Sequence, residues 1–478
     1  MGIPMNDSNL ISRLNAIRAT DKFDTQVIDQ FAEFITTAPD EELFHMSPLR
    51  YAEHANAAQE TAVDLFLYAT HAGILDFNWG VLCPSCGAFL TKKSGLRWLH
   101  TKKHCSLCQL DTTPSIDEQI EIAFTISPAV RSIRFHNVEK LEFERDGFFT
   151  FFSTSVALHP EIHQIVYSSV QAGFRIPAVS THEIKRTFES NHYLLMVPTT
   201  HAVAHIPVND SQAPREVEFE LLFDGQLVPE IQPLAPGEGL IRLHNRTRRA
   251  VPLGLLRDHR MAPTPPEQRA GSLYTLTPYL TAKELINSQT FRDLFRMESI
   301  PPAGGLEIKN LTLLFTDLKG STAMYDRIGD FNAYALVREH FALLRGIVAA
   351  RHGAIVKTMG DAIMASFSDP ASALEAAAVM RHETQKASSG ENLVLKIGLH
   401  SGPCVAVETN EQLDYFGQTV NLASRVQAVA QAGEIVCTEA VYHAPHVPEV
   451  IRKAGLHSTQ DQALLKGVGN PVTFYRLH

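Results

Sequence analysis

The spacing of apolar residues changes along the chain and predicts three kinds of structure. Up to about residue 75, apolar residues recur at helical spacing, for example at Leu10 and Leu14, which predicts a helical module over residues 1–80. From residue 119 to 258, apolar and polar residues alternate, which predicts a mostly antiparallel, sandwich-like β domain. After residue 304, predicted strands and helices alternate as in an α/β or α+β unit.

Turn signals place individual strands within the β domain. Asp224-Gly225 is a typical hairpin pair, and it follows four apolar residues that alternate with polar ones: Val217, Phe219, Leu221 and Phe223. Asp146-Gly147 follows Leu141 and Phe143 in the same way, so a second strand is predicted over Phe148–Phe152. A basic stripe consists of Arg242, Arg246, Arg248 and Arg249. It either binds an anionic ligand or is a solvated strand face, and we expect the solvated face.

A linker and a connecting helix are predicted between the β domain and the C-terminal unit. His259–Ser272 contains three prolines and has the composition of a linker. Thr281 and Glu284 have the spacing of a capping box, so a helix is expected from there to about Arg296. In the C-terminal unit, another helix is predicted from residues that share one face: Tyr334, Val337, Phe341, Leu344 and Val348.

Composition and charge exclude some functions. The 478 residues carry a net charge of −10, so nothing in the overall charge attracts nucleic acid or an anionic membrane. No apolar run reaches the roughly 18 residues that a membrane span needs. The first 30 residues lack the features of a signal peptide. We therefore expect a cytoplasmic protein with neither a nucleic-acid partner nor a membrane span.

Four of the six cysteines form two CxxC pairs, Cys83 with Cys86 and Cys105 with Cys108. The spacing between the pairs is typical of a four-thiolate zinc site. Such a closed site leaves no position for water, so one structural zinc ion is predicted in residues 81–118. A redox dithiol pair and a chance arrangement are the alternatives. His100 and His104 are expected to be bystanders.

Two aspartates mark the candidate chemistry of the C-terminal unit. Asp317 ends an apolar strand, and Asp361 lies in a tight turn between two others that could bring it beside Asp317. Two adjacent carboxylates of this kind suit a pair of divalent ions, and magnesium fits such a sparse oxygen site. The turn after Asp317 offers backbone N–H groups to phosphate oxygens and consists of Lys319, Gly320, Ser321 and Thr322.

A predicted helix near residue 420 carries Asn421 and Arg425 one turn apart, hence on one face. This pair either stabilises charge on a phosphorus centre and a ribose oxygen or is an ordinary surface pair. Asp414 lies just before this helix, and its carboxylate could accept hydrogen bonds from the amino group of a nucleobase. His400 is expected to be structural rather than a general base.

Considered together, these segments resemble the catalytic domain of class III nucleotidyl cyclases. The resemblance rests on four motifs in order: FTDLKGST, VKTMGD, IGLHSGP and DYFGQTVNLASR. It implies a ferredoxin-like α/β fold for residues 305–478. It also implies that Asp317, Asp361 and the backbone of Leu318 bind two Mg²⁺ or Mn²⁺ ions. Residues 1–300 are similar to an uncharacterised module that precedes bacterial cyclase domains.

The resemblance implies roles for the remaining residues and a reaction. Lys357 and Asp414 would select adenine, and Asn421 and Arg425 would stabilise the transition state. The expected protein is an adenylate cyclase that converts ATP at two sites shared across a homodimer. A guanylate or other nucleotidyl cyclase, and a zinc-stabilised scaffold with a non-catalytic cyclase-like domain, are the alternatives. No feature of residues 1–300 identifies a regulatory ligand.

The whole chain is thus expected to be a multidomain α+β protein. The expected order is a helical module (1–80), a zinc knuckle (81–118), a mostly antiparallel β domain (119–258), a linker with a connecting helix (259–304), and a cyclase domain (305–478).

Overall fold

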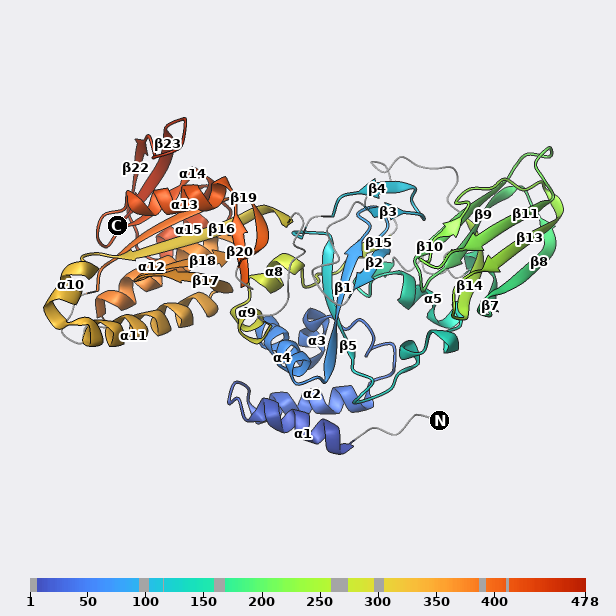
Figure 1. Ribbon diagram of the computed structural model, residues 1–478, viewed down its shortest axis with the longest axis horizontal. Helices are drawn as coiled ribbons and strands as arrows, with labels where there is room; N and C mark the ends of the chain where they lie inside the picture. Colours follow the sequence, from blue (N-terminus) through green and yellow to red (C-terminus); the bar gives the residue numbers. More distant parts are fainter. Residues whose placement is uncertain are drawn as a thin grey trace. The chain divides into compact units, whose positions relative to one another are not determined.

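The computed structural model describes eight ranges of the chain: 7–93, 103–114, 116–158, 168–258, 274–295, 305–386, 393–409 and 412–478. Contacts divide the chain into two compact units, the first built mainly from residues up to Leu280 and the second mainly from Thr281–His478 (Figure 1). The linker predicted at His259–Ser272 lies outside the described residues. None of the helices in these ranges is long and apolar enough to cross a membrane.

Four helices begin the first unit, as predicted: α1 (Asp7–Arg18), α2 (Thr25–Thr37), α3 (Pro48–Ala55) and α4 (Gln59–His71). Asn56 ends α3 in the left-handed conformation, which separates α3 from α4. Phe31 and Phe66 are fully buried, with ring centroids 5.6 Å apart, so this part is a packed helical module.

A three-stranded antiparallel sheet follows the helices, in the order β2-β1-β5. Its strands are β1 (Leu75–Leu82), β2 (Phe89–Lys93) and β5 (Ile120–Ile126). The short hairpin of β3 (Lys103–Cys105) and β4 (Leu110–Thr112) comes between β2 and β5 in the chain. Both CxxC pairs therefore lie at the ends of strands.

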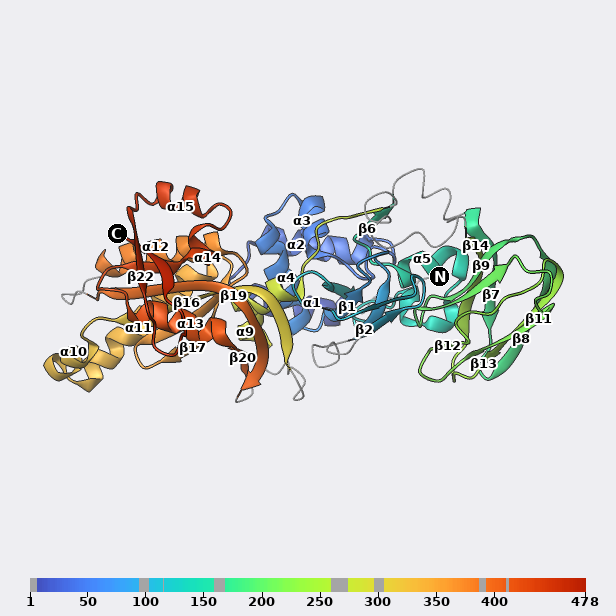
Figure 2. The same ribbon diagram turned by 90° about the horizontal axis from the view of Figure 1, so that it is seen from above.

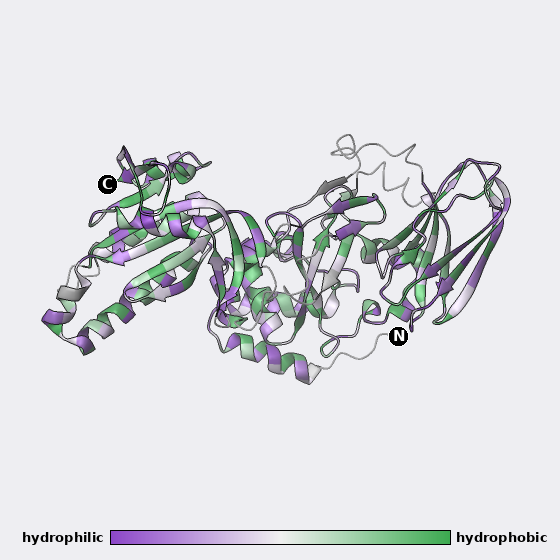
Figure 3. Ribbon diagram, turned by 45° about the horizontal axis from the view of Figure 1, so that its top comes forward, coloured by the Kyte–Doolittle hydropathy of each residue, from purple (hydrophilic) through white to green (hydrophobic). Residues whose placement is uncertain are grey.

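The predicted sandwich is present as two four-stranded sheets (Figure 2). One has the order β10-β9-β14-β7, with bounds Ala202–Val208, Asn191–Val197, Val251–Asp258 and Val170–Ile176. The other has the order β12-β11-β13-β8, with bounds Leu227–Val228, Glu216–Leu221, Gly237–Asn245 and Ser180–Phe188. Pairing is antiparallel except between β11 and β13. Apolar side chains of both sheets form one core, and apolar and polar residues alternate along the strands (Figure 3).

The turn at Asp224-Gly225 is confirmed, because β11 and β12 pair across it. Phe223, however, is 75% exposed and belongs to the turn rather than to the buried face. Of the basic stripe, Arg242 lies on strand β13, as expected, whereas Arg246, Arg248 and Arg249 lie in the turn between β13 and β14. Arg242 is bonded to Glu183, Glu216 and Glu218, and these acids neutralise it.

The strand predicted at Phe148–Phe152 is wrong, because this segment belongs mainly to helix α5 (Phe143–Phe151). Asp146, interpreted as a turn residue, is 1% exposed within that helix. Its carboxylate accepts hydrogen bonds from Arg134, Arg145 and the backbone of Glu142. The contact with Arg134 comes from outside the helix, so a local turn signal could not reveal it. Short elements around α5 are two 3-10 turns, Arg134–His136 and Val138–Lys140, and the paired strands β6 (Val156–Leu158) and β15 (Tyr274–Leu276).

The second unit contains a sheet in the order β17-β18-β16-β19-β21-β23-β22, with β20 paired to β19. In chain order its strands are β16 (Leu306–Leu318), β17 (Gly353–Met359), β18 (Ala362–Phe367), β19 (Leu395–Thr409), β20 (Gln412–Phe416), β21 (Ile435–Thr438), β22 (Ser458–Ala463) and β23 (Val472–Leu477). Strands and helices alternate as the sequence predicts, which agrees with a mixed α/β cyclase domain.

Helices cover both faces of this sheet (Figure 1). The helices are α10 (Ser321–Ile328), α11 (Asp330–Ala349), α12 (Pro370–Lys386), α13 (Gln418–Ala428), α14 (Glu439–Tyr442) and α15 (Val447–Lys453). Ile435 and Cys437 of β21 pack with the core that contains α11 and α12. Val436, between them, packs instead with Val426 of α13, so α13 lies on the opposite face. Tyr334, expected on the apolar face of α11, is 64% exposed.

The connecting helix is two short helices rather than one, α8 (Ala282–Ile286) and α9 (Gln289–Leu294). The predicted capping box of Thr281 and Glu284 is present. Ser288 starts α9 by accepting a hydrogen bond from the backbone N–H of Phe291. The single helix to Arg296 is therefore wrong at Asn287-Ser288, and Arg296 itself is outside the described residues.

Candidate active site and metal centre

The structure brings Asp317 and Asp361 together. Asp317 lies at the end of β16, and Asp361 directly precedes β18, the antiparallel neighbour of β16. Gly360 has a φ of 64°, which side chains with a Cβ rarely adopt, and it allows the tight turn before Asp361. Burial and the negative charge of Asp361 raise the pKa of the Asp317 carboxyl. The two carboxylates therefore interact electrostatically.

The carboxylate pair has the chemistry of a divalent-metal site. Asp361 Oδ2 is buried and has no hydrogen-bond partner among the residues that the structure describes. An unpartnered buried carboxylate oxygen is costly unless a cation or donor satisfies it. Lys396 Nζ, 3.9 Å from Asp317 Oδ2, is the nearby positive charge that sequence analysis missed. The donor set thus fits Mg²⁺ or Mn²⁺, which prefer carboxylate oxygens.

The segment after Asp317 forms the predicted turn. Leu318 is buried at the end of β16, and the Lys319 N–H donates to Val394 O at 2.9 Å. Gly320 has a φ of 73° and precedes α10, whose first residues are Ser321 and Thr322. The turn therefore leads directly into a helix N-terminus, where backbone N–H groups favour anions.

Lys357 and Asp414 form a contact that joins two strands. Lys357 Nζ on β17 lies 2.6 Å from Asp414 Oδ2 on β20. The second carboxylate oxygen of Asp414 accepts the Tyr415 N–H at 2.8 Å. The Lys357 and Asp414 side chains are 39% and 16% exposed, so a ligand can reach this pair.

Asn421 and Arg425 lie on α13 and are both exposed. They are one turn apart and therefore present an amide and a guanidinium on one face. The six candidate residues thus occupy three places: the carboxylate pair, the Lys357–Asp414 pair and the exposed face of α13.

Two histidines of the unit have lowered pKa values. His400 Nδ1 is 2.8 Å from Thr438 Oγ1, and burial lowers the pKa of His400 to about 4, so it has the surroundings of a structural residue. His340 was missed by sequence analysis. It is 3% exposed on α11, and burial lowers its pKa to about 4, although the charge of Asp361 acts in the opposite direction. Its position beside Asp361 is a tertiary feature that helix periodicity does not reveal.

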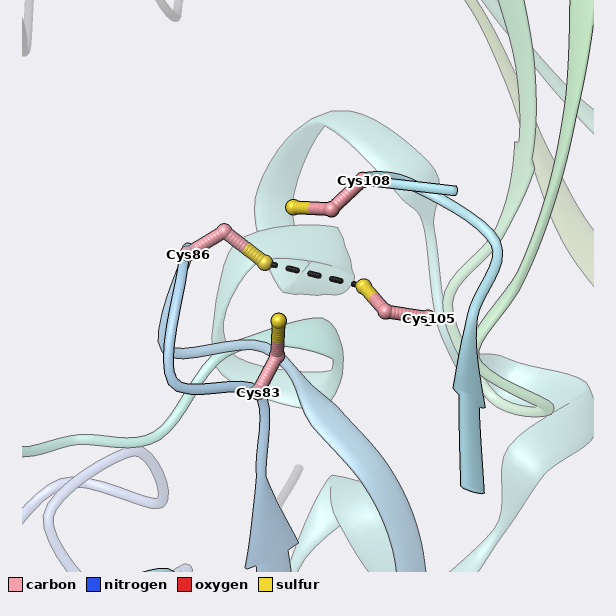
Figure 4. A group of neighbouring side chains, drawn as sticks. All are labelled: Cys83, Cys86, Cys105 and Cys108. Carbon is pink, nitrogen blue, oxygen red and sulfur yellow. Dashed lines mark hydrogen bonds between the residues drawn. The ribbon is translucent and has the colours of Figure 1, made fainter. Parts of the chain in front are cut away.

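The four predicted zinc ligands converge in the first unit. Their Sγ atoms all lie within 4.8 Å of one another (Figure 4). Cys86 Sγ and Cys105 Sγ are 3.8 Å apart. A tetrahedron with Zn–S bonds of about 2.3 Å has edges of about 3.8 Å. The cluster therefore fits one tetrahedral zinc ion.

The cysteine cluster packs on its surroundings rather than facing solvent. Cys83 and Cys105 are buried in a core that includes Phe151 of α5 and Met196 of β9. His104 is not part of the cluster, because its ring bonds to Asp111 at 2.8 Å and lies 3.2 Å from Glu230. His100 is outside the described residues.

Two family models match the chain. A family of unknown function, DUF5939, matches residues 7–293. The adenylate and guanylate cyclase catalytic domain matches residues 306–478. The second match covers every strand of the sheet that carries Asp317, Asp361 and Asp414.

Individual relatives match about a third of the chain. Receptor-type adenylate cyclase GRESAG 4.1 of Trypanosoma brucei brucei is 25% identical over 209 residues, and the match covers 35% of this chain and 17% of that protein. The chain thus spans under a fifth of that relative. Among the solved structures that match, two have a TM-score of 0.32 each. One is the adenylyl cyclase CyaB from P. aeruginosa, which is 22% identical in a match that covers 37% of this chain and 96% of that chain. The other is the guanylate cyclase domain of RhGC from Catenaria anguillulae, which is 23% identical in a match that covers 36% of this chain and 97% of that chain.

Proposed function

Because the chain belongs to the DUF5939 family and carries a class III nucleotidyl cyclase domain at residues 306–478, we propose that it is an adenylate cyclase that converts ATP into 3′,5′-cyclic AMP and pyrophosphate. The observation that carries this proposal is the carboxylate pair, in which Asp361 Oδ2 is buried without a partner among the described residues and the charge of Asp361 raises the Asp317 pKa. ATP as substrate and thiolates as zinc ligands both fit a location in the reducing cytoplasm.

Asp317, Asp361 and the Leu318 carbonyl would hold two Mg²⁺ or Mn²⁺ ions. When bound, such ions make a ribose hydroxyl more acidic and neutralise triphosphate charge. The turn at Lys319–Thr322 supports the triphosphate through its backbone N–H groups. The ribose 3′-oxygen then bonds to the α-phosphorus as the bond to pyrophosphate breaks, and its proton passes to water or to a phosphate oxygen of the substrate.

The exposed pair on α13 acts on the charge that develops in this step. Arg425 places a guanidinium against the oxygens of the α-phosphate. Asn421 orients the ribose through its amide. Because a fixed geometry lowers the entropic cost of ring closure, positioning accounts for much of the expected rate.

Lys357 and Asp414 support ATP as the substrate. The Lys357 ammonium can donate to adenine N1, and the Asp414 carboxylate can accept from the exocyclic amine. Guanine presents a carbonyl and an N1–H instead, so both contacts would be mismatched. Buried mismatches of this kind discriminate by factors of up to roughly 10⁴–10⁵.

The active form is a homodimer in this proposal. In the class III family the metal pair comes from one domain and the other four residues from its partner. Elements that carry the candidate residues, or adjoin them, expose large apolar side chains, which is typical of association surfaces. These are Phe331 (86% exposed), Tyr334 (64%), Met359 (41%) and Phe416 (73%).

The test is a product assay on the full chain with Mn²⁺ and each of ATP, GTP, CTP and UTP. The proposal predicts cyclic AMP and pyrophosphate in equal amounts, with GTP turned over at least tenfold more slowly. Equal or faster turnover of GTP would indicate a guanylate cyclase. No cyclic product from any nucleotide would contradict the enzyme and favour a scaffold.

A further inference from the structure

The segment that precedes the catalytic sheet, here called the connector, comprises α8, the break at Asn287-Ser288 and α9. The DUF5939 match ends at residue 293, within the connector. By its contacts, however, the connector belongs to the same compact unit as the catalytic domain. Its contacts with that domain are specific and polar, and several of them reach the strands that carry Asp414 and Lys357.

Arg292 of α9 holds both neighbours of Asp414. Its Nη1 donates to Leu413 O at 2.8 Å, and its Nη2 donates to the Tyr415 hydroxyl at 3.0 Å. Its Nε donates to Ile286 O at 2.9 Å, which anchors the same guanidinium to α8. A planar guanidinium with three fixed bonds restrains the backbone on one side of Asp414 and the side chain on the other.

Asn287 restrains Tyr415 from the connector break. Asn287 is 0% exposed, and its Oδ1 accepts the Tyr415 hydroxyl at 3.0 Å and Ser366 Oγ at 2.5 Å. Tyr415 is 3% exposed, so its hydroxyl depends on these protein partners. Losing one of them would leave a buried polar group with fewer bonds, which is unfavourable.

The connector also contacts the strand of Lys357. Gln289 Oε1 accepts the backbone N–H of Ile355 at 2.8 Å, two residues before Lys357 on β17. The Lys357–Asp414 contact at 2.6 Å therefore joins β17 and β20, and the connector forms its own hydrogen bonds to each of these two strands.

We propose that Arg292 is a positioning residue for nucleobase recognition: by holding Leu413 and Tyr415 it sets the place of the Asp414 carboxylate relative to Lys357. The inference rests on the proposed function, because it assigns Asp414 and Lys357 to the base. It extends the recognition site from the cyclase domain into a segment that the DUF5939 match includes up to residue 293. Arg292 itself does not touch the substrate.

The experiment uses the full chain and two matched variants. Arg292→Met removes the three bonds but keeps the length of the side chain. Arg345→Met removes the ion pair of Arg345 with Asp293, which also joins the connector to the catalytic domain but bonds nothing on β20. For each variant we would measure the dissociation constants of fluorescent methylanthraniloyl-ATP and -GTP, and the kcat and KM for ATP and GTP.

Arg292→Met is expected to reduce the preference for ATP over GTP about tenfold, mainly through binding and KM, as a displaced polar contact would. Arg345→Met should keep the wild-type preference. Arg292→Lys, which can reach one acceptor, should recover part of it. Equal effects of the two Met variants on the preference, or an unchanged preference in Arg292→Met, would overturn the inference.

The same measurements separate this inference from the proposed function. If wild-type protein forms no cyclic nucleotide from any triphosphate, the proposed function fails. If wild type prefers ATP but Arg292→Met melts at the wild-type temperature and keeps that preference, only the role of Arg292 fails. A variant with a lower melting temperature is assayed below it, where the binding ratio remains measurable.

Discussion

The Lys357 ammonium on β17 lies 2.6 Å from the Asp414 carboxylate on β20, although the two residues are 57 positions apart in the chain. The contact places one donor and one acceptor side by side at a partly exposed position. A nucleobase that offers an acceptor next to an amine can bond to both residues and so replace the direct contact between Lys357 and Asp414.

Asp414→Asn should therefore weaken adenine recognition. The amide nitrogen would present a donor where the exocyclic amine of adenine needs an acceptor. We expect the ATP-over-GTP ratio of kcat/KM to fall by about 10²-fold. Initial-rate assays with both nucleotides measure the ratio. Asp461→Asn is the control, because Asp461 bonds Arg476 in the same domain but lies on another strand, β22. A wild-type ratio in Asp414→Asn would remove Asp414 from base recognition.

The shared-site dimer predicts complementation between two inactive variants. Asp317→Ala and Arg425→Ala homodimers should each be inactive, because every site lacks one required group. Each mixed dimer would have one intact site of two, so the isolated mixed dimer should have roughly half of wild-type turnover and the random mixture roughly a quarter. Co-expression with two different affinity tags isolates the mixed dimer. A mixed dimer with no turnover would contradict the shared site.

The buried Asp146 predicts a pH-dependent stability of the first unit. Burial alone would raise its pKa, but hydrogen bonds from Arg145, the Glu142 backbone and Arg134 lower it below the ordinary value of 3.8. Asp146→Asn should therefore lower the free energy of unfolding by about 3 kcal/mol at neutral pH.

The sign of the pH dependence follows from the lowered pKa. The folded state binds the Asp146 proton less readily than the unfolded state, so the stabilisation is complete above pH 3.8 and is lost as pH falls through the folded pKa. Urea unfolding of wild type and Asp146→Asn from neutral to acidic pH measures the difference. A difference that stays constant down to the lowest pH would show that the charge does not stabilise the fold.

The cysteine cluster predicts one zinc ion per chain. Cys86→Ser should lose the metal and lower the melting temperature of the first unit, because a four-thiolate site contributes its binding energy to folding. Metal analysis by mass spectrometry and calorimetry measure both effects. Cys437→Ser is the control, since Cys437 is also a free cysteine but lies in the catalytic unit. Purified wild-type protein without zinc, and unaffected by a chelator, would contradict the site.

Local sequence patterns predicted much of this molecule. Strand ends, turns and helix faces depend on nearby residues, so the positions of Asp317, Asp361 and Asn421 on their elements followed from the motifs. The cysteine spacing likewise predicted a cluster that the structure brings together. These features are local in the chain or repeat a short spacing.

Features that depend on distant partners could not be predicted. The α5 helix was interpreted as a turn and strand from the local Asp146-Gly147 pair. Arg134, which lies outside the helix, bonds to Asp146, and the local pattern does not show this contact. The connector was interpreted as one helix, although Asn287 at its break is used by Ser366 and Tyr415. Periodicity alone contains no information about such contacts.

The central claim is that Asp317 and Asp361 together hold the divalent ions that ring closure needs. The most direct test is the titration of full-length wild type, Asp317→Asn and Asp361→Asn with Mn²⁺, with bound metal followed by electron paramagnetic resonance and pyrophosphate release followed in parallel with ATP. Both variants should bind Mn²⁺ at least tenfold more weakly and lose roughly 10³-fold or more in turnover, since ion binding and catalysis depend on the same carboxylates. Wild-type Mn²⁺ affinity and turnover in either variant would contradict the account.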